Sequence, residues 1–311
     1  MNKWKGDVAF LLVVGIVIGV WVSLYPHPGD SLLSPITPPP ELNILPLTYA
    51  SFSGEELAYR LYEPAGETRY VLIFLHDTLL HSGWYAELGR ELAAKGVAVF
   101  LPDRRGWGHS SGDHRSTVQH RDLLLDDITA MMTVAQVRYP QRQVFLGGHG
   151  RGAGLAVRYV ASQKPVSGLV LISPYLAEQQ PNLDLEGWQT LVRAHPGEAF
   201  LARTGLYDWP VWHYNWPQSM VDADPLLETR YALSWGKKTM LQDPSASCAA
   251  ISVPLLCVQG QSDPLFDADK TQEWMDTWAI SDQKLETLIG VDYLGVLGEA
   301  AHPIAFWLAG R

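Results

Sequence analysis

Cysteine is scarce in this sequence, and basic residues never form a long run. Only Cys248 and Cys257 occur among 311 residues, and no pair of Cys or His residues has the spacing of metal ligands. The formal net charge is −10, so the chain as a whole repels the phosphate backbone of DNA or RNA. We therefore expect no nucleic acid as a partner, no metal and no cofactor.

The two cysteines leave two alternatives open. Outside the cytoplasm they could form a disulfide. Cys257, however, lies in an apolar run at residues 253–258, where a buried free thiol is the more ordinary state of a cysteine.

Charge is absent from residues 8–25, which are dominated by Val, Leu and Ile. A helix of this length covers about 27 Å, which is enough to span the apolar core of a bilayer. A buried core helix would show a polar face and a cleaved signal peptide would end in a small-x-small site, but this stretch has neither. We expect residues 1–25 to form a single membrane anchor. Because Lys3 and Lys5 precede the span and no basic residue follows it closely, the N-terminus is expected in the cytoplasm and the domain outside, in the periplasm if the source is Gram-negative.

Residues 26–46 are rich in Pro and Ser and contain Pro38-Pro39-Pro40, a composition typical of an extended linker. From residue 47 to residue 311, β-type runs alternate with stretches of helical spacing, which predicts an α/β domain with a doubly wound, mostly parallel sheet. The expected strands are 47–52, 56–62, 70–75, 97–101, 143–147, 168–172, 253–259 and 284–288, and the expected helices are 86–95, 123–139, 153–163, 268–279 and one that ends near residue 308.

The alternation is interrupted at about residues 175–250, where only short helical pieces are expected. This stretch contains several prolines and the tryptophans Trp188, Trp209, Trp212, Trp216 and Trp235. Because it follows a strand of the sheet, we interpret it as an inserted cap over the strand ends.

The motif at the centre of the chain is Gly148-His149-Gly150-Arg151-Gly152. It joins an apolar run that ends at Gly147 to a helix-compatible run that begins near Ala153. A sharp turn of this kind, which lifts one side chain above a parallel sheet, is typical of the nucleophile elbow of an α/β-hydrolase. The outer glycines suit a turn that leaves no room for neighbouring side chains. The middle position, where a nucleophile is expected, is Gly150.

Further motifs follow in the order found in one branch of that family. They are residues 76–85 (His-Asp-Thr-Leu-Leu-His-Ser-Gly-Trp-Tyr), 101–112, 171–174, Asp224-Pro225 and 258–263. Together with the elbow, they resemble the monoacylglycerol lipase, lysophospholipase and serine aminopeptidase branch of the α/β-hydrolases over residues 47–308. The resemblance implies the α/β-hydrolase fold and hydrolysis of carboxylic esters, in which a serine attacks the carbonyl, a histidine takes its proton and an acid orients the histidine.

The resemblance puts the serine position at Gly150 and the acid position at Asp263. Two residues compete for the histidine position. Tyr293 ends the run Leu-Ile-Gly-Val-Asp-Tyr after the last strand and lies 30 residues beyond Asp263, which is close to the family's separation, whereas His302 lies 39 residues beyond it. We assign Tyr293 to this position and keep His302, the only histidine after Asp263, as an alternative base.

The oxyanion loop implied by the resemblance is also altered. Its donors would be the backbone N–H groups of Thr78 and Arg151. Asp77 stands where the family has a glycine, and a carboxylate there would repel a developing oxyanion unless it is turned away or protonated. In the following loop, we expect Arg104 and Arg105 to brace the chain and His109, His114 and His120 not to bind metal.

These residues lead to two hypotheses. In the first, the chain is a membrane-anchored, hydrolase-fold protein that no longer hydrolyses acyl esters and binds an apolar small molecule or a protein partner. In the second, it is an active enzyme, either an acyl hydrolase with displaced residues or a cofactor-free lyase or oxygenase that uses Asp263 and His302.

The expected topology can be tested with a reporter. Alkaline phosphatase fused after Pro46 should be active, because this enzyme folds only outside the cytoplasm. Activity of a cytoplasmic reporter at the same position would contradict the predicted orientation.

Overall fold

The structure, a computed structural model, describes residues 31–311 except residue 79 and residues 113–120, 195–209 and 233–238. The expected membrane anchor at residues 1–25 lies outside this part of the chain. Among the described residues, no helix is both long and apolar enough to cross a bilayer.

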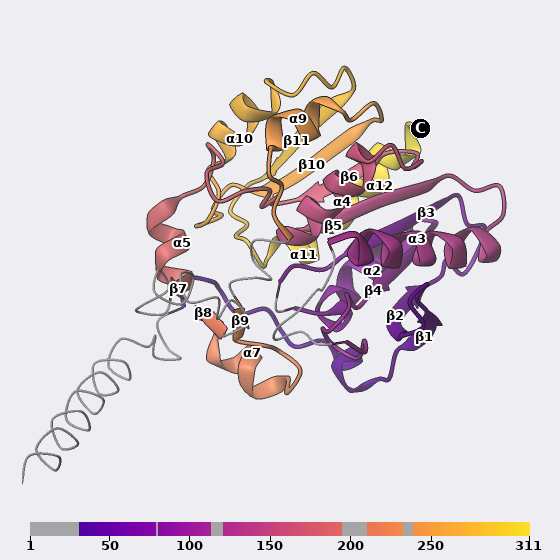
Figure 1. Ribbon diagram of the computed structural model, residues 1–311, viewed down its shortest axis with the longest axis horizontal. Helices are drawn as coiled ribbons and strands as arrows, with labels where there is room; N and C mark the ends of the chain where they lie inside the picture. The colour runs from indigo at the N-terminus through magenta and orange to yellow at the C-terminus, as the bar shows by residue number, and fades with distance from the viewer. Residues whose placement is uncertain (1–30, 79, 113–120, 195–209, 233–238) are drawn as a thin grey trace, which may run out of the picture.

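An eight-stranded sheet forms the centre of the domain (Figure 1), with the strand order β1-β2-β4-β3-β5-β6-β10-β11. The strands are β1 (Leu47–Ala50), β2 (Glu56–Tyr62), β3 (Tyr70–Leu75), β4 (Val97–Pro102), β5 (Val144–His149), β6 (Leu169–Ile172), β10 (Leu255–Gly260) and β11 (Gln283–Leu288). The six strands from β4 to β11 run parallel, and β2 is antiparallel to both of its neighbours.

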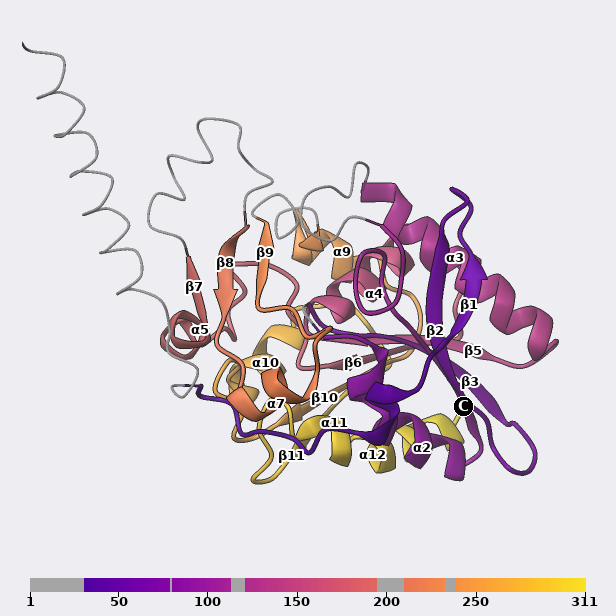
Figure 2. The ribbon, with the colours of Figure 1, turned by 90° about the horizontal axis from the view of Figure 1, so that it is seen from below.

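Helices cover both faces of this sheet (Figure 2). On one face lie α2 (Ala86–Ala94), α11 (Val296–Glu299) and α12 (Ala301–Ala309), and on the other lie α3 (Arg121–Arg138) and α4 (Arg151–Ala161). Strands that alternate with helices reach this arrangement through right-handed crossovers. The predicted doubly wound α/β fold is therefore confirmed. The observed element bounds follow the predicted ones closely, although α10 (Ala268–Met275) ends earlier than expected.

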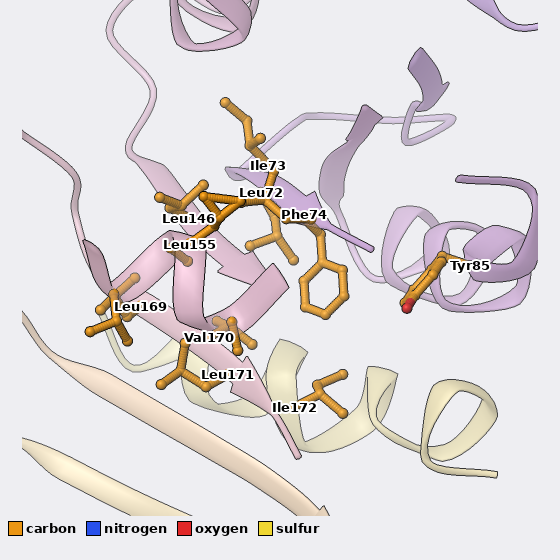
Figure 3. Close-up of a cluster of buried hydrophobic side chains, with 14 of the residues drawn as sticks. Leu72, Ile73, Phe74, Tyr85, Leu146, Leu155, Leu169, Val170, Leu171 and Ile172 are labelled. Atoms are coloured by element: carbon orange, nitrogen blue, oxygen red, sulfur yellow. The ribbon is translucent and has the colours of Figure 1, made fainter. Parts of the chain in front are cut away.

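The central strands are apolar at nearly every position because both of their faces are covered. Every residue of β4 and β5 is buried. Figure 3 shows Leu72 and Phe74 of β3 beside Leu146 of β5 and Leu155 of α4, all of which are almost fully buried. A parallel strand in this setting lacks the alternation of a half-exposed strand, which makes these runs recognisable in the sequence.

Cys248 and Cys257 are both buried and do not form a disulfide. Burial raises the pKa of each thiol to about 12. The alternative of buried free thiols is the one that the structure shows.

Part of the expected linker lies against the domain. Leu33 is only 3% exposed, and the backbone N–H of Ser34 donates to Asp292 Oδ2 at 3.1 Å. Glu41 forms an ion pair with Arg90 of α2. We call residues 31–43 the strap. Figure 2 shows it in indigo, crossing one side of the domain before the chain enters β1.

The stretch interpreted as a cap, at about residues 175–250, forms a small sheet of its own and short helices. Its described elements are α5 (Leu185–Leu191), the three-stranded sheet of β7 (Val192–Ala194), β8 (Pro210–Tyr214) and β9 (Arg230–Ala232), and the helices α7 (Gln218–Ala223) and α9 (Pro244–Ala249). Trp84, which follows β3, donates its indole N–H to Asp224 Oδ2 at 2.7 Å. The N–H of Asp184 in the cap donates to the carbonyl of Leu265, which follows β10, at 2.8 Å. The cap is therefore joined to segments that follow the carboxyl ends of the sheet strands.

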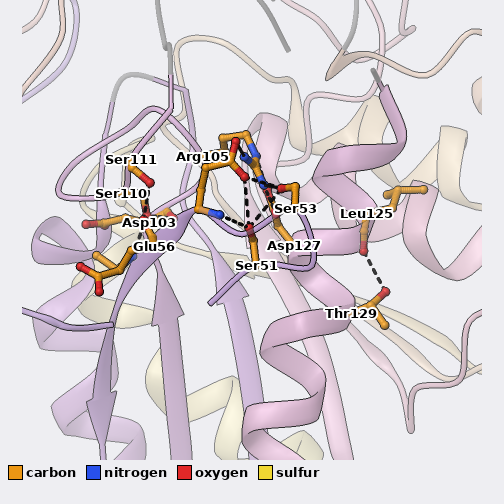
Figure 4. Close-up of polar contacts among 12 residues, drawn as sticks. Ser51, Ser53, Glu56, Asp103, Arg105, Ser110, Ser111, Leu125, Asp127 and Thr129 are labelled. Atoms are coloured by element: carbon orange, nitrogen blue, oxygen red, sulfur yellow. Dashed lines mark hydrogen bonds and ion pairs between the residues drawn. The ribbon is translucent and has the colours of Figure 1, made fainter. Parts of the chain in front are cut away.

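Arg105 braces the loop after β4, as expected. Its guanidinium donates to both carboxylate oxygens of Asp127 on α3, at 2.9 and 2.6 Å, and also to Ser53 Oγ (Figure 4). Glu55 lies 2.8 Å from the same guanidinium. Arg105 and Asp127 are both buried, so the pair has good geometry and little competition from water.

Asp127→Ala should lower the free energy of unfolding by about 3 kcal/mol, because it leaves a buried guanidinium without its main partner. Urea unfolding measures this loss. The neighbouring Asp126→Ala, at a partly exposed position, should change stability by no more than about 0.5 kcal/mol. Equal losses for the two variants would show that the pair does not brace the loop.

Candidate functional site

The turn between β5 and α4 has the geometry expected from its glycines. Gly150 adopts φ +53° and ψ −118° between the end of β5 at His149 and the start of α4 at Arg151. A Cβ on Gly148 would collide with the backbone of Gly152, and a Cβ on Gly152 would collide with the carbonyl of Leu75. The outer glycines are thus required by close backbone contacts.

The space beside Gly150 is filled by two side chains. A Cβ built on Gly150 would lie less than 3.0 Å from Cγ and Oδ1 of Asp77 and from Oη of Tyr293. Real Cβ atoms do not approach other atoms so closely, so any residue other than glycine requires Asp77 or Tyr293 to move. The volume that a nucleophilic side chain would occupy belongs to these two residues.

Asp77 is held by donors on both of its carboxylate oxygens. Oδ1 accepts the backbone N–H of Arg151 at 2.8 Å, and Oδ2 accepts the hydroxyl of Tyr293 at 2.6 Å. Asp77 is 2% exposed and lies at the N-terminus of α4, where the helix dipole and the first backbone N–H groups favour an anion. Asp77 is therefore not turned away from the oxyanion donors: its carboxylate points at the N–H of Arg151.

Tyr293 is positioned by a second layer of aromatic residues. Its ring lies 4.4 Å from the ring of His149, centroid to centroid, and His149 Nδ1 lies 2.9 Å from the hydroxyl of Tyr85. The backbone N–H of Asp77 donates to the same hydroxyl at 2.8 Å. Burial and the neighbouring Asp77 carboxylate raise the pKa of Tyr293 well above its ordinary value, so the phenol stays protonated and acts as a donor.

Tyr85 and His149 were not assigned to the site from the sequence. Both lie inside the quoted motifs, but neither occupies a position that the family uses for catalysis. Burial lowers the pKa of His149 to about 4, so this imidazole is neutral at pH 7. It serves as a rigid, uncharged support for Tyr293.

Asp263 follows β10 and is buried, and none of its side-chain partners among the described residues is a histidine. Its Oδ2 accepts the hydroxyl of Ser173 at 2.8 Å, and its Oδ1 accepts the backbone N–H groups of Leu265 and Phe266. No positively charged group contacts it among the described residues. Burial raises the pKa of Asp263 to about 7, although these three donors oppose the shift.

His302 does not join the site. It lies in the first turn of α12 and its side chain is exposed, whereas the described partners of the Asp263 carboxylate are residues 173, 265 and 266. The structure therefore does not bring together the His302–Asp263 pair that the second hypothesis requires.

The side chain of Arg151 extends from the elbow to the cap. Thr78, the other residue assigned to the oxyanion loop, is fully buried. The Arg151 guanidinium donates to the hydroxyl of Tyr231 on β9 at 2.9 Å and lies 4.6 Å from the ring centre of Tyr175. It also lies 5.3 Å from the ring centre of Tyr231. Arg151 thus binds Asp77 through its backbone N–H and contacts the aromatic residues Tyr175 and Tyr231 through its side chain.

The cap tryptophans that can be placed pack inward. Trp216 is 1% exposed and its ring stacks on Tyr214, and the ring of Tyr214 lies edge-on to Trp188. Trp209 and Trp235, and the side chain of Trp212, lie outside what the structure describes. The described aromatic residues form a continuous layer above Arg151.

The described histidines near the loop after β4, His81 and His109, each lie beside a carboxylate. His81 Nε2 lies 2.7 Å from Asp224 Oδ2, and His109 Nδ1 lies 3.9 Å from Asp103 Oδ2. Across the described residues, no group of three or more His, Cys, Asp or Glu side chains is arranged to hold a metal ion. His114 and His120 fall outside these residues.

With this geometry established, the chain can be compared with known proteins. Residues 66–291 match the family model of the serine aminopeptidases, S33. The chain belongs to this family. It is 26% identical over 273 residues to human monoglyceride lipase, covering 83% of this chain and 88% of the human one. It is 24% identical over 264 residues to monoacylglycerol lipase of Mycolicibacterium smegmatis, covering 78% of this chain and 88% of that one.

Solved structures agree on the fold of this S33 family member. A soluble variant of Saccharomyces cerevisiae monoglyceride lipase in complex with a substrate analog superposes with a TM-score of 0.70, at 15% identity, over 92% of this chain and 99% of that one. A monoacylglycerol lipase from Paleococcus ferrophilus gives a TM-score of 0.59 at 18% identity, over 82% and 98%. The S33 match ends at residue 291, just before Tyr293.

Asp263→Asn should change how stability depends on pH. Because the pKa of Asp263 is raised in the folded state to about 7, the folded protein binds a proton that the unfolded chain has released, so stability falls as pH rises from about 4 to about 7. Asparagine can accept from Leu265 and Phe266 and donate to Ser173 without a charge. The variant should gain stability relative to wild type over this range, by at most about 4 kcal/mol.

Urea unfolding at several pH values between 4.5 and 7.5 measures this difference. Subtracting the two profiles removes the contributions of the buried histidines, which both proteins share. Asp276→Asn, at an exposed position, should give a profile parallel to wild type. A parallel profile for Asp263→Asn as well would contradict the raised pKa.

Proposed function

We propose that this protein has kept the S33 hydrolase fold but does not form an acyl-enzyme, and that it acts by binding an apolar ligand or a protein partner. The observation that carries the proposal is the filled space beside Gly150. Acyl transfer needs a nucleophilic side chain at the elbow, a base beside it and free oxyanion donors. Each of these three requirements is unmet at a different residue.

The nucleophile is missing because residue 150 has no side chain. The base is missing because a phenol with a raised pKa, Tyr293, occupies the place beside the elbow. The oxyanion donor is occupied because the N–H of Arg151 already donates to Asp77. A carboxylate in this position resembles the negative charge that the donor would stabilise in a working enzyme, so the site is satisfied without a substrate.

The choice of an apolar ligand is supported by the relatives and by the cap. The names of the similar proteins refer to monoglycerides, which carry a long acyl chain. The cap of this chain presents aromatic side chains above Arg151. A cap of this composition suits an apolar molecule or an apolar segment of a partner.

We further propose that the protein is anchored in a membrane by residues 8–25, with its N-terminus in the cytoplasm and its domain outside. The support is the uncharged run and the two lysines that precede it. An anchored domain would meet apolar ligands or partners at the membrane that holds it.

Labelling with a fluorophosphonate probe tests the loss of acyl transfer. The wild-type protein should not be labelled, and Gly150→Ser alone should not be labelled either, because the new side chain overlaps Asp77 and Tyr293. The combined variant Gly150→Ser, Asp77→Gly, Tyr293→His frees the space and supplies nucleophile and base. It should gain labelling at residue 150. Labelling of the wild-type protein at any serine, together with ester hydrolysis, would contradict the proposed loss of acyl transfer.

A matched pair of alanine variants separates overlap from backbone strain. Gly150→Ala places a Cβ at φ +53° and against Asp77, whereas Gly54→Ala places one at φ +91° with no atom within 4 Å. Strain alone costs about 1–3 kcal/mol, so Gly54→Ala should lose about that much stability and Gly150→Ala clearly more.

A further inference from the structure

We propose that the strap, residues 31–43, holds the loop at residues 290–295 in the position that keeps Tyr293 beside Gly150. The proposal rests on the proposed function and extends it, because it concerns what keeps Tyr293 in the space beside Gly150. It makes the chain before β1 a controlling element of the site.

The strap contacts the loop directly. The backbone N–H of Ser34 donates to Asp292 Oδ2 at 3.1 Å, while Asp292 Oδ1 accepts the N–H of Gly295 at 2.7 Å. One carboxylate therefore bonds to the strap and to its own loop. The next residue is Tyr293, whose hydroxyl donates to Asp77. A chain of contacts thus runs from the strap to the space beside Gly150.

Leu33 fixes the strap at this end. It is 3% exposed and belongs to the hydrophobic core of the domain. At the other end, Glu41 pairs with Arg90 and Leu42 lies against Gly83. Arg90 is about half exposed, and an ion pair open to solvent contributes little. The buried Leu33 is therefore the main anchor.

The strap is stiff enough to transmit a displacement. Four of its thirteen residues are proline: Pro35, Pro38, Pro39 and Pro40. Proline-rich chains favour the extended polyproline conformation and have little freedom to lose on docking. The strap also connects the uncharged run at residues 8–25 to the first strand.

The loop itself has few other supports at its start. Gly290 adopts φ +73° with no atom near the place of a Cβ, and Ile289 is 86% exposed. Beyond them, the carbonyl of Val291 accepts the N–H of Ser262 at 2.9 Å. Without the strap, this segment would begin at an unpacked hinge. Local opening is then expected at lower free energy than unfolding of the sheet.

Hydrogen exchange of the full-length protein, followed by mass spectrometry, tests the proposal. Leu33→Asp puts a charge at the buried anchor and should release the strap. Exchange of the amides at residues 291–297 should then become about tenfold faster or more, while the amides of β3 keep the wild-type rate. Leu45→Asp is the matched control, because Leu45 follows the strap but is 81% exposed, and it should leave both regions unchanged.

The amides of Leu42 and Ile44, which donate within the strap region, report whether the strap has been released. Faster exchange there with no change at residues 291–297 would overturn the proposal. If Leu33→Asp leaves those amides protected, Glu41→Arg is added, because an arginine there repels Arg90 and releases the other end of the strap. Exchange at residues 291–297 of this double variant is then compared with that of the wild-type protein. If β3 also exchanges faster, Leu33→Ala replaces the aspartate variant and is read in the same way.

This test is independent of the proposed function. Fluorophosphonate labelling of the wild-type protein would refute the loss of acyl transfer without changing the exchange result. Unchanged exchange at residues 291–297 would refute the role proposed for the strap, and it would not affect the conclusion that residue 150 lacks a nucleophile.

Discussion

The hydrogen bond from the N–H of Arg151 to the carboxylate of Asp77 is the contact on which the rest of the site depends. It places a negative charge at the start of α4, where backbone dipoles favour it. A buried carboxylate needs every available donor, and the hydroxyl of Tyr293 supplies the second one. Gly150 must then remain without a side chain, because Asp77 and Tyr293 lie where that side chain would be.

The same turn connects the site to the cap. While its backbone holds Asp77, the side chain of Arg151 lies between Tyr175 and Tyr231 and binds the hydroxyl of Tyr231. The side chain of Asp263, by contrast, does not bond to the elbow, and its partners among the described residues are Ser173 and two backbone N–H groups. The residue assigned to the acid position is thus a buried carboxyl with a pKa raised to about 7.

The fold was predictable because its strands are buried on both faces and its glycines mark turns. The apolar runs at residues 70–75 and 97–101 reappear as β3 and β4. The positions of Gly150, Asp263 and Tyr293 followed from motif order. The direction of the Asp77 side chain did not, because it depends on a donor 74 residues away in the chain.

Packing between residues far apart in the chain also accounts for the other differences between the sequence-based predictions and the structure. The roles of Tyr85 and His149 arise from rings that meet only in the folded protein. Composition predicts that residues 26–46 are extended, and it cannot reveal that Leu33 finds a buried site or that Ser34 meets Asp292, 258 residues away. His302 matched the expected residue type, but its helix presents it to solvent.

The overlap at Gly150 has a consequence for the history of the chain. A side chain at residue 150 and the present positions of Asp77 and Tyr293 exclude each other, so under the proposed loss of acyl transfer a serine at this position could not have coexisted with the present site. A later return of serine alone meets a steric barrier, and a loss of Asp77 alone leaves the donors at α4 and Tyr293 without their acceptor. Under the proposed loss of acyl transfer, Gly150, Asp77 and Tyr293 therefore depend on one another, and no single change among them would restore an acyl-transfer site.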